Sequence, residues 1–137
     1  MTSRNVRIGR LGEQAAQRYL EERGYRVLDR NWRSPAPDQQ GELDLVLRDR
    51  RELVVCEVKT RTGTALAHPA EAVTPEKAAR LRRLAVLWLR AHPSARSRSP
   101  AGRGSAAPAL RIDVVAVRLD PREPHSLISV DHLRAVA

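Results

Sequence analysis

Residues 41–60, GELDLVLRDRRELVVCEVKT, decide the fold that the sequence predicts. Two runs of aliphatic and β-branched residues flank a short charged segment at 49–52, which is the pattern of a β-hairpin. Both runs also contain charged residues: Glu42, Asp44, Glu57 and Lys59. A charge in a half-buried strand costs free energy unless it is paired or binds an ion. These four side chains therefore either lie on a solvated face or form a site.

The register of this hairpin brings the four charged residues together. A two- or four-residue loop at its tip pairs residues whose numbers sum to 101, so Asp44 faces Glu57 and Glu42 faces Lys59. Side chains alternate between the faces of a strand, so both pairs share one face. We expect the opposite face to pack on a core, because it is apolar throughout: Leu43, Leu45, Leu47, Val54, Cys56 and Val58. A slip of one residue would move acids into that apolar face, which favours this register.

Two opposed carboxylates are the chemical feature of this cluster. Directly opposed Cβ atoms of an antiparallel pair lie about 4.5–5.5 Å apart, and like charges at that distance destabilise a sheet. A divalent cation between Asp44 and Glu57 would remove this penalty, and hard oxygen ligands favour Mg²⁺ or Mn²⁺. Lys59 would then orient a water molecule or stabilise charge on a phosphate. The alternative stays open that the acids are merely solvated and that Glu42 and Lys59 form an ordinary ion pair.

The composition favours one small domain with a polyanionic partner. The chain has 137 residues, of which 42% are hydrophobic but only 3% aromatic, so its core must be aliphatic. Lys and Arg number 25 against 16 Asp and Glu, and the net charge of +9 favours nucleic acid or an anionic membrane surface as partner. Cys56 is the single cysteine of the sequence, which excludes an intramolecular disulfide and is typical of a reducing compartment.

No segment of the sequence predicts secretion or a membrane anchor. The N-terminus lacks the apolar core of a signal peptide, and the longest apolar run, at 84–89, is far too short to span a bilayer. The four histidines have no zinc-site spacing. We therefore expect a soluble cytoplasmic protein without a membrane partner.

Two helices follow from apolar residues at helical spacing. The first is predicted at 8–23, where Gly24 is a natural stop, and the second at 74–92. Thr74 is the expected N-cap of the second helix and Pro75 its expected first residue.

The other predicted segments complete one mixed α/β domain over residues 1–137. Residues 93–109 are rich in Pro, Gly, Ser and Arg and predict a flexible basic loop. The order α-β-β-β-α-β predicts a mixed sheet. Further strands are expected at 25–33, 110–119 and 125–130, and a terminal helical turn at 131–137.

The motifs GELDLVL and LVVCEVKTR resemble the core of the PD-(D/E)xK nuclease superfamily, which has the restriction-endonuclease-like fold. More closely, the chain resembles the YraN-like family of bacterial endonuclease-related proteins, which are similar to archaeal Holliday junction resolvases. The matching segments span nearly the whole chain: GRLGEQAAQRYLEERGYRVLDRNWR, GELDLVLRDRRELVVCEVKTR, PAEAVTPEKAARLRRLAVLWL, RIDVVAV and ISVDHLRAVA.

This resemblance implies a fold, an activity and a set of residues. The fold is a restriction-endonuclease-like mixed β-sheet flanked by helices. The activity is Mg²⁺- or Mn²⁺-dependent hydrolysis of DNA phosphodiesters, with branched or flapped DNA as candidate substrates. Glu42 matches a supporting position and Asp113 a structural one. The residues that match the catalytic set are Glu13, Asp44, Glu57 and Lys59, and the metal ligands implied are Asp44, Glu57 and the carbonyl of Val58.

Three basic residues are candidates for contacts with the DNA backbone. Arg33 and Arg61 flank the charged face of the hairpin, and Lys77 lies at the start of the second helix. Such contacts bind DNA without regard to its sequence and weaken steeply with salt. Each of the three is equally an ordinary surface position.

Two other functions stay open on the sequence alone. A domain of this size has little surface for a substrate clamp unless it forms a homodimer. The chain is therefore also compatible with a nucleic-acid-binding or adaptor protein that keeps the nuclease fold and cuts nothing alone. The third option is a protein-interaction module that uses the hairpin edge or the second helix.

Overall fold

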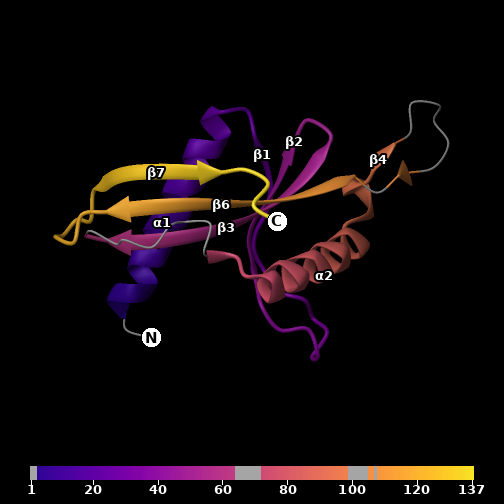
Figure 1. Cartoon of the computed structure of the whole chain (residues 1–137), viewed down its shortest axis with the longest axis horizontal. Coiled ribbons are helices and arrows are strands. Elements are labelled where there is room, and N and C mark those ends of the chain that lie inside the picture. The colour runs from indigo at the N-terminus through magenta and orange to yellow at the C-terminus, as the bar shows by residue number, and fades with distance from the viewer. Residues whose placement is uncertain (1–2, 64–71, 99–104, 107) are drawn as a thin grey trace.

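A five-stranded sheet with one helix on each face organises the chain (Figure 1). The computed structural model describes residues 3–63, 72–98, 105–106 and 108–137. Its elements, in chain order, are α1 (Ser3–Glu22), β1 (Arg26–Trp32), β2 (Leu43–Asp49), β3 (Glu52–Thr62), α2 (Pro75–Ala91), the 3-10 helix η2 (Pro93–Ala95), β4 (Ser97–Arg98), β5 (Ser105–Ala106), β6 (Ala109–Leu119) and β7 (Leu127–Leu133).

The strand order of the sheet is β1-β2-β3-β6-β7. Strands β3 and β6 are parallel, as expected for a connection that crosses over through α2, and the other neighbours are antiparallel. The predicted fold class is confirmed: this is a mixed α/β domain whose five-stranded mixed sheet has two flanking helices, an arrangement consistent with a restriction-endonuclease-like fold.

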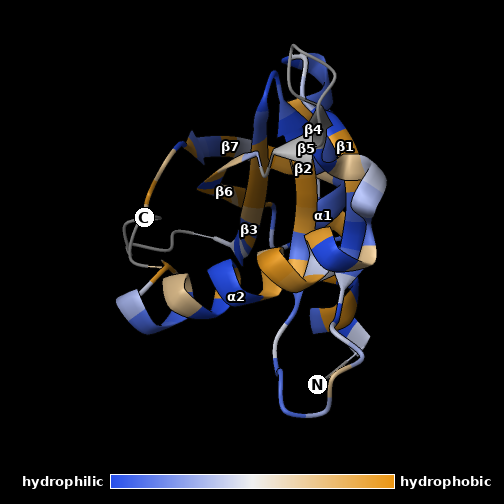
Figure 2. Cartoon of the chain, turned by 90° about the vertical axis from the view of Figure 1, so that its right-hand side faces the viewer, coloured by the Kyte–Doolittle hydropathy of each residue, from blue (hydrophilic) through white to orange (hydrophobic). Residues whose placement is uncertain are grey.

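Mostly aliphatic side chains fill the space between the sheet and each helix. The central strands are largely hydrophobic, whereas both helices also carry hydrophilic residues (Figure 2). On β3, Val54 and Cys56 pack towards α1, whereas Leu53 and Val55 pack towards α2. The expectation of a core on only one face of the hairpin is therefore wrong, because α2 buries the second face as well. Glu42, Asp44, Glu57 and Lys59 all lie towards the open end of the hairpin.

The predicted register of the hairpin is confirmed, but it stops short of the charged residues. Paired residues run from Asp49↔Glu52 to Leu45↔Cys56, and their numbers sum to 101. Beyond this point β2 stays paired only with β1, as Trp32↔Leu43. Leu43 packs on the α2 side while Leu45 packs on the α1 side, so the expected alternation breaks at Asp44. The predicted pairings of Asp44 with Glu57 and of Glu42 with Lys59 are both wrong, because β2 leaves β3 after Leu45.

The start of α2 agrees with the sequence, as Pro75 is its first residue and the Thr74 side chain accepts a hydrogen bond from the Lys77 N–H. Helix α1 starts five residues before the predicted position, at Ser3, and Gly24 follows its end with a φ of +89°. Neither helix combines the length and the apolar character needed to cross a bilayer, as far as the described residues go.

The C-terminal segment is extended, so the predicted helical turn at 131–137 is wrong. Strand β7 continues to Leu133, and the Val136 N–H then donates to the Ile112 carbonyl across the sheet. Within the predicted basic loop at 93–109, the described parts form η2 and the short β4–β5 pair. Residues 99–104 and 107 lie outside the described residues, and the predicted flexibility of this loop stays a prediction.

Candidate active site

Carboxylates from three segments of the chain meet beside the start of β2. One carboxylate oxygen from each of Glu13, Glu42 and Asp44 lies within 4.8 Å of the other two. Glu13 comes from the middle of α1, Glu42 from the residue before β2, and Asp44 from β2 itself. Glu57 of β3 is close enough for its charge to affect Asp44. We call these four residues the acid cluster.

The Asp44 side chain takes the place of a strand carbonyl at the open end of the hairpin. The Val58 N–H donates a hydrogen bond of 2.9 Å to Asp44 Oδ2. In the hairpin register Val58 would pair with Leu43, but backbone pairing has already ended at Cys56. The N–H and C=O of a strand residue leave the backbone on the same side, so the Val58 carbonyl faces the same gap. The Asp44 carboxylate and the Val58 carbonyl, both predicted metal ligands, are therefore neighbours.

Glu57 is held by the lysine at the start of α2. Lys77 Nζ lies 2.6 Å from Glu57 Oε1, and the two side chains are only 22% and 10% exposed. Glu57 follows Val55 on the face of β3 that α2 covers, and the Thr74 cap fixes where the helix begins. Lys77, predicted to contact DNA, thus neutralises one carboxylate of the acid cluster.

The surroundings of Asp44 disfavour the charged form of its carboxylate. Burial raises the pKa of Asp44 to about 7. The negative charge of Glu57 adds to this rise in pKa, and the hydrogen bond from Val58 opposes it. Glu13 and Glu42 add smaller repulsions. Among the residues that the structure describes, no basic side chain forms an ion pair with Asp44 or Glu13.

A close contact between α1 and β3 positions Glu13. Gly12 is buried against the sheet, and a Cβ atom at this position would lie 1.9 Å from Thr60 Oγ1. Only a residue without a side chain permits this approach. Glu13, the next residue of the helix, lines one open pocket together with Val58 and Lys59.

The predicted basic residues near the acid cluster differ in exposure and in their partners. Lys59 is half-buried and forms no ion pair with any described residue. Arg61 is exposed and lines the same pocket, and its Nη1 donates to the Thr60 carbonyl over 3.3 Å. Arg33, 72% exposed, forms an ion pair of 3.0 Å with Glu42. Of the two lysines at this site, Lys77 forms an ion pair, whereas Lys59 has no ionic partner among the described residues.

Asn31 is the residue of this site that the sequence analysis missed. Its Nδ2 donates to Glu13 Oε2 over 3.0 Å and to Glu42 Oε1 over 2.9 Å, so one amide ties together acids from two segments. Asn31 has a φ of +49°, a conformation that asparagine adopts more readily than most residues. The available signal was an asparagine within a strand pattern, where this residue type is disfavoured.

Asp113 belongs to a separate buried network at the tip end of the hairpin. It accepts hydrogen bonds from Arg111, His132 and the Ala135 N–H. Burial favours a raised pKa for Asp113, but the hydrogen bonds from His132 and Arg111 outweigh it and hold the pKa at about 2. Arg111 also reaches the hairpin tip through ion pairs with Asp49 and Glu52. These contacts agree with the structural role expected for Asp113.

Comparison with known proteins gives the family of this chain. Residues 12–117, which include the whole acid cluster, match the model of the uncharacterised protein family UPF0102. A UPF0102 protein of Frankia alni is 49% identical over 127 residues, which cover 93% of this chain and 91% of the relative. A UPF0102 protein of Streptomyces coelicolor is 48% identical over 130 residues, covering 95% of this chain and 88% of the relative. One from Mycolicibacterium vanbaalenii is 45% identical over 136 residues, covering 99% and 98%. The chain therefore belongs to the uncharacterised protein family UPF0102.

Proposed function

We propose that this protein is a metal-dependent nuclease that hydrolyses DNA phosphodiester bonds at the acid cluster. The observation that carries the proposal is the meeting of Asp44 and Glu13, which have no basic partner among the described residues, beside the ammonium of Lys59. Mutually repelling, partly buried carboxylates oppose folding, so a functional role is the better explanation for them. The resemblance to the PD-(D/E)xK superfamily and the Holliday junction resolvases supports the same activity.

The donor set of the cluster suits Mg²⁺ or Mn²⁺. The Asp44 carboxylate, the Glu57 carboxylate and the Val58 carbonyl would supply hard oxygen ligands, with water molecules completing the coordination. The cation, when bound, would supply Lewis-acid charge neutralisation for phosphodiester hydrolysis. Lys77 would have to release Glu57, and a phosphate oxygen of the substrate is a suitable new partner for its ammonium.

The remaining residues would position the reactants. Lys59 would donate to a phosphate oxygen and stabilise the charge that develops there. Glu13, held by the Asn31 amide, would accept a hydrogen bond from the attacking water and orient it. Arg61, together with Arg33 across the cluster, would contact flanking phosphates of the DNA backbone.

DNA as substrate is supported by the net charge of +9. Branched or flapped DNA is the substrate class that the resolvase resemblance favours, and a homodimer would offer such DNA a second basic surface. The cytoplasm is the compartment that we propose, in keeping with the unpaired, buried Cys56, whose pKa burial raises.

The test is cleavage of linear, flapped and four-way-junction DNA in Mg²⁺ or Mn²⁺ by the wild type and by the Asp44→Asn and Lys59→Ala variants. The proposal predicts metal-dependent cleavage that both substitutions reduce by at least 100-fold, as expected for loss of a metal ligand or of transition-state charge stabilisation, roughly 10²–10³. Cleavage that survives both substitutions would reject the site. DNA binding without turnover in all proteins would instead support the non-catalytic alternative.

A further inference from the structure

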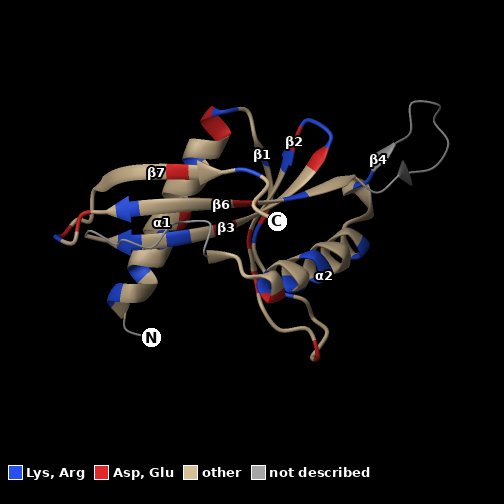
Figure 3. Ribbon diagram, viewed as in Figure 1, with Lys and Arg blue, Asp and Glu red and all other residues tan. Residues whose placement is uncertain are grey.

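Basic residues recur along α2 (Figure 3), and its arginines are exposed. Arg80, Arg83 and Arg90 are separated by three and seven residues, a spacing that places them along one strip of a helix. Arg82 is also exposed, but it lies about 200° around the helix from Arg80. Glu76, in the first turn, is the one acidic residue of α2. We call Arg80, Arg83 and Arg90 the basic strip.

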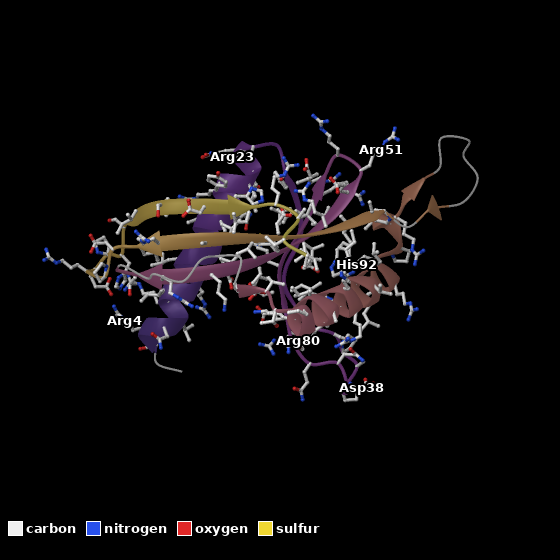
Figure 4. All side chains as sticks on the ribbon, in the orientation of Figure 1. Arg4, Arg23, Asp38, Arg51, Arg80 and His92 are labelled. Atoms are coloured by element: carbon white, nitrogen blue, oxygen red, sulfur yellow. The ribbon has the colours of Figure 1, made fainter. Side chains whose placement is uncertain are left out.

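The basic strip begins beside the acid cluster. A Cβ atom on Gly41 would lie 3.2 Å from both Cδ and Nε of Arg80, so Arg80 packs against the residue that directly precedes Glu42. Farther along the helix, Arg83 and Arg90 flank a shallow, largely apolar groove whose other lining residues are Gln39, Val86 and Leu87. Figure 4 labels Arg80 on α2 and Asp38 in the connection between β1 and β2, which passes beside this helix. The strip thus follows the boundary between α2 and the segment that leads into the site.

The dimensions and chemistry of this surface suit a nucleic-acid backbone. From Arg80 to Arg90, α2 rises about 15 Å, which equals about four base-pair steps of duplex DNA. Leu81, Leu84 and Trp88 of α2 are buried in the core, whereas Val86, 45% exposed, lies in the groove beside the strip. Guanidinium groups are well suited to bind phosphates in a bidentate manner.

We propose that the basic strip binds the phosphate backbone of a duplex DNA arm and guides it to the acid cluster. This inference rests on the proposed function, because it takes DNA as the partner of that site. It adds a surface that lies beyond Arg33 and Arg61 and that fixes the direction in which the duplex leaves the site.

The test is equilibrium binding of fluorescently labelled duplex DNA and four-way-junction DNA in EDTA, where no metal-dependent cleavage occurs, with phosphatidylserine vesicles as a second anionic probe. Binding is measured as a function of salt for the wild type and for the triple variant R80A/R83A/R90A. The control is R18A/R82A/R122A, which removes the same charge from exposed arginines outside the strip. Circular dichroism and thermal unfolding check that all proteins are folded.

The strip variant should lose roughly 100-fold or more in affinity at 0.1 M salt, and its salt slope should fall by about 2.7, since each phosphate contact contributes about 0.9. The control should bind within about threefold of the wild type. Equal losses in both triple variants, no loss in the strip variant, or no DNA binding by the wild type at low salt would overturn the proposal. So would a strip variant that loses binding only to the vesicles. Absence of cleavage by a wild type whose binding depends on the strip would reject the nuclease activity but leave this surface standing.

Discussion

The Val58 N–H donates its hydrogen bond to the Asp44 carboxylate, 2.9 Å away, at the point where β2 has already separated from β3. The Asp44 carboxylate thereby accepts the hydrogen bond that a backbone carbonyl of β2 would accept if the two strands had stayed paired. The bond ties the acid cluster to the sheet, but it leaves Asp44 partly buried among three other acids.

Asp44→Asn should stabilise the metal-free protein, and the gain should grow with pH. The pKa of Asp44 is about 7 in the folded protein and 3.8 as its ordinary value, so the folded state keeps a proton that the unfolded state loses between these pH values. Wild-type stability should therefore fall from about pH 4 to pH 7, and Asn, which still accepts from Val58, removes this loss. Urea unfolding of both proteins at pH 4.5 and pH 8 in EDTA measures this difference in the free energy of unfolding. A difference between variant and wild type that does not change with pH would contradict the assignment.

Lys77→Ala should tighten the binding of a divalent cation. The ammonium of Lys77 is bound to Glu57 at 2.6 Å, and a hydrogen bond to a charged group contributes roughly 1.5–3 kcal/mol, so its removal should increase Mn²⁺ affinity roughly 10- to 100-fold. Isothermal titration calorimetry at pH 8 measures the affinity. Arg82→Ala, another cation of the same helix, is the control and should match the wild type. Unchanged or weaker Mn²⁺ binding by Lys77→Ala would show that Glu57 is not a ligand.

Two glycines of α1 should respond to alanine in opposite ways. Gly12→Ala places a Cβ atom 1.9 Å from Thr60 Oγ1, so it should push α1 from β3, cost about 1–3 kcal/mol or more of stability, and weaken Mn²⁺ binding because Glu13 moves. A Cβ atom added at Gly9 would meet nothing within 4 Å, so Gly9→Ala should stabilise the helix by about 1 kcal/mol. Thermal unfolding of the two variants compares them directly. Equal effects would mean that the close contact with Thr60 does not position α1.

Asp113→Asn should destabilise the protein at neutral pH while leaving Mn²⁺ affinity intact. A buried ion pair that loses one partner costs about 3–5 kcal/mol, here because Arg111 keeps its charge in the interior. The pKa of Asp113 is about 2 against an ordinary 3.8, so its contribution is full above about pH 4 and disappears as the pH falls towards 2. Urea unfolding at pH 7 and pH 3 measures the change, with exposed Asp38→Asn as the control. A variant as stable as the wild type at pH 7 would contradict the structural role.

The sequence predicted the hairpin well because its alternating pattern tolerates one register only. A slip of one residue would move charged residues of the hairpin into the core that Leu45, Leu47, Val54 and Cys56 fill, and the structure has the predicted pairing. The start of α2 was equally predictable, since Thr74 and Pro75 act locally.

The details of the acid cluster were not predictable, because they depend on contacts between distant segments. Lys77 meets Glu57 only because α2 packs across that face of β3, and the ion pair of Arg33 with Glu42 forms only because β2 leaves β3 after Leu45. The Asn31 bridge depends on a left-handed backbone residue that no periodic pattern reveals. At the C-terminus, backbone pairing with β6 overrode the weak helical pattern of 131–137.

The most direct measurement of the central claim is anomalous X-ray diffraction from a crystal of the protein equilibrated with Mn²⁺. We expect an anomalous peak about 2.0–2.2 Å from an Asp44 carboxylate oxygen and the Val58 carbonyl oxygen, with Lys77 moved away from Glu57. Saturating Mn²⁺ that leaves no peak at the acid cluster, with Lys77 still bound to Glu57, would contradict the claim.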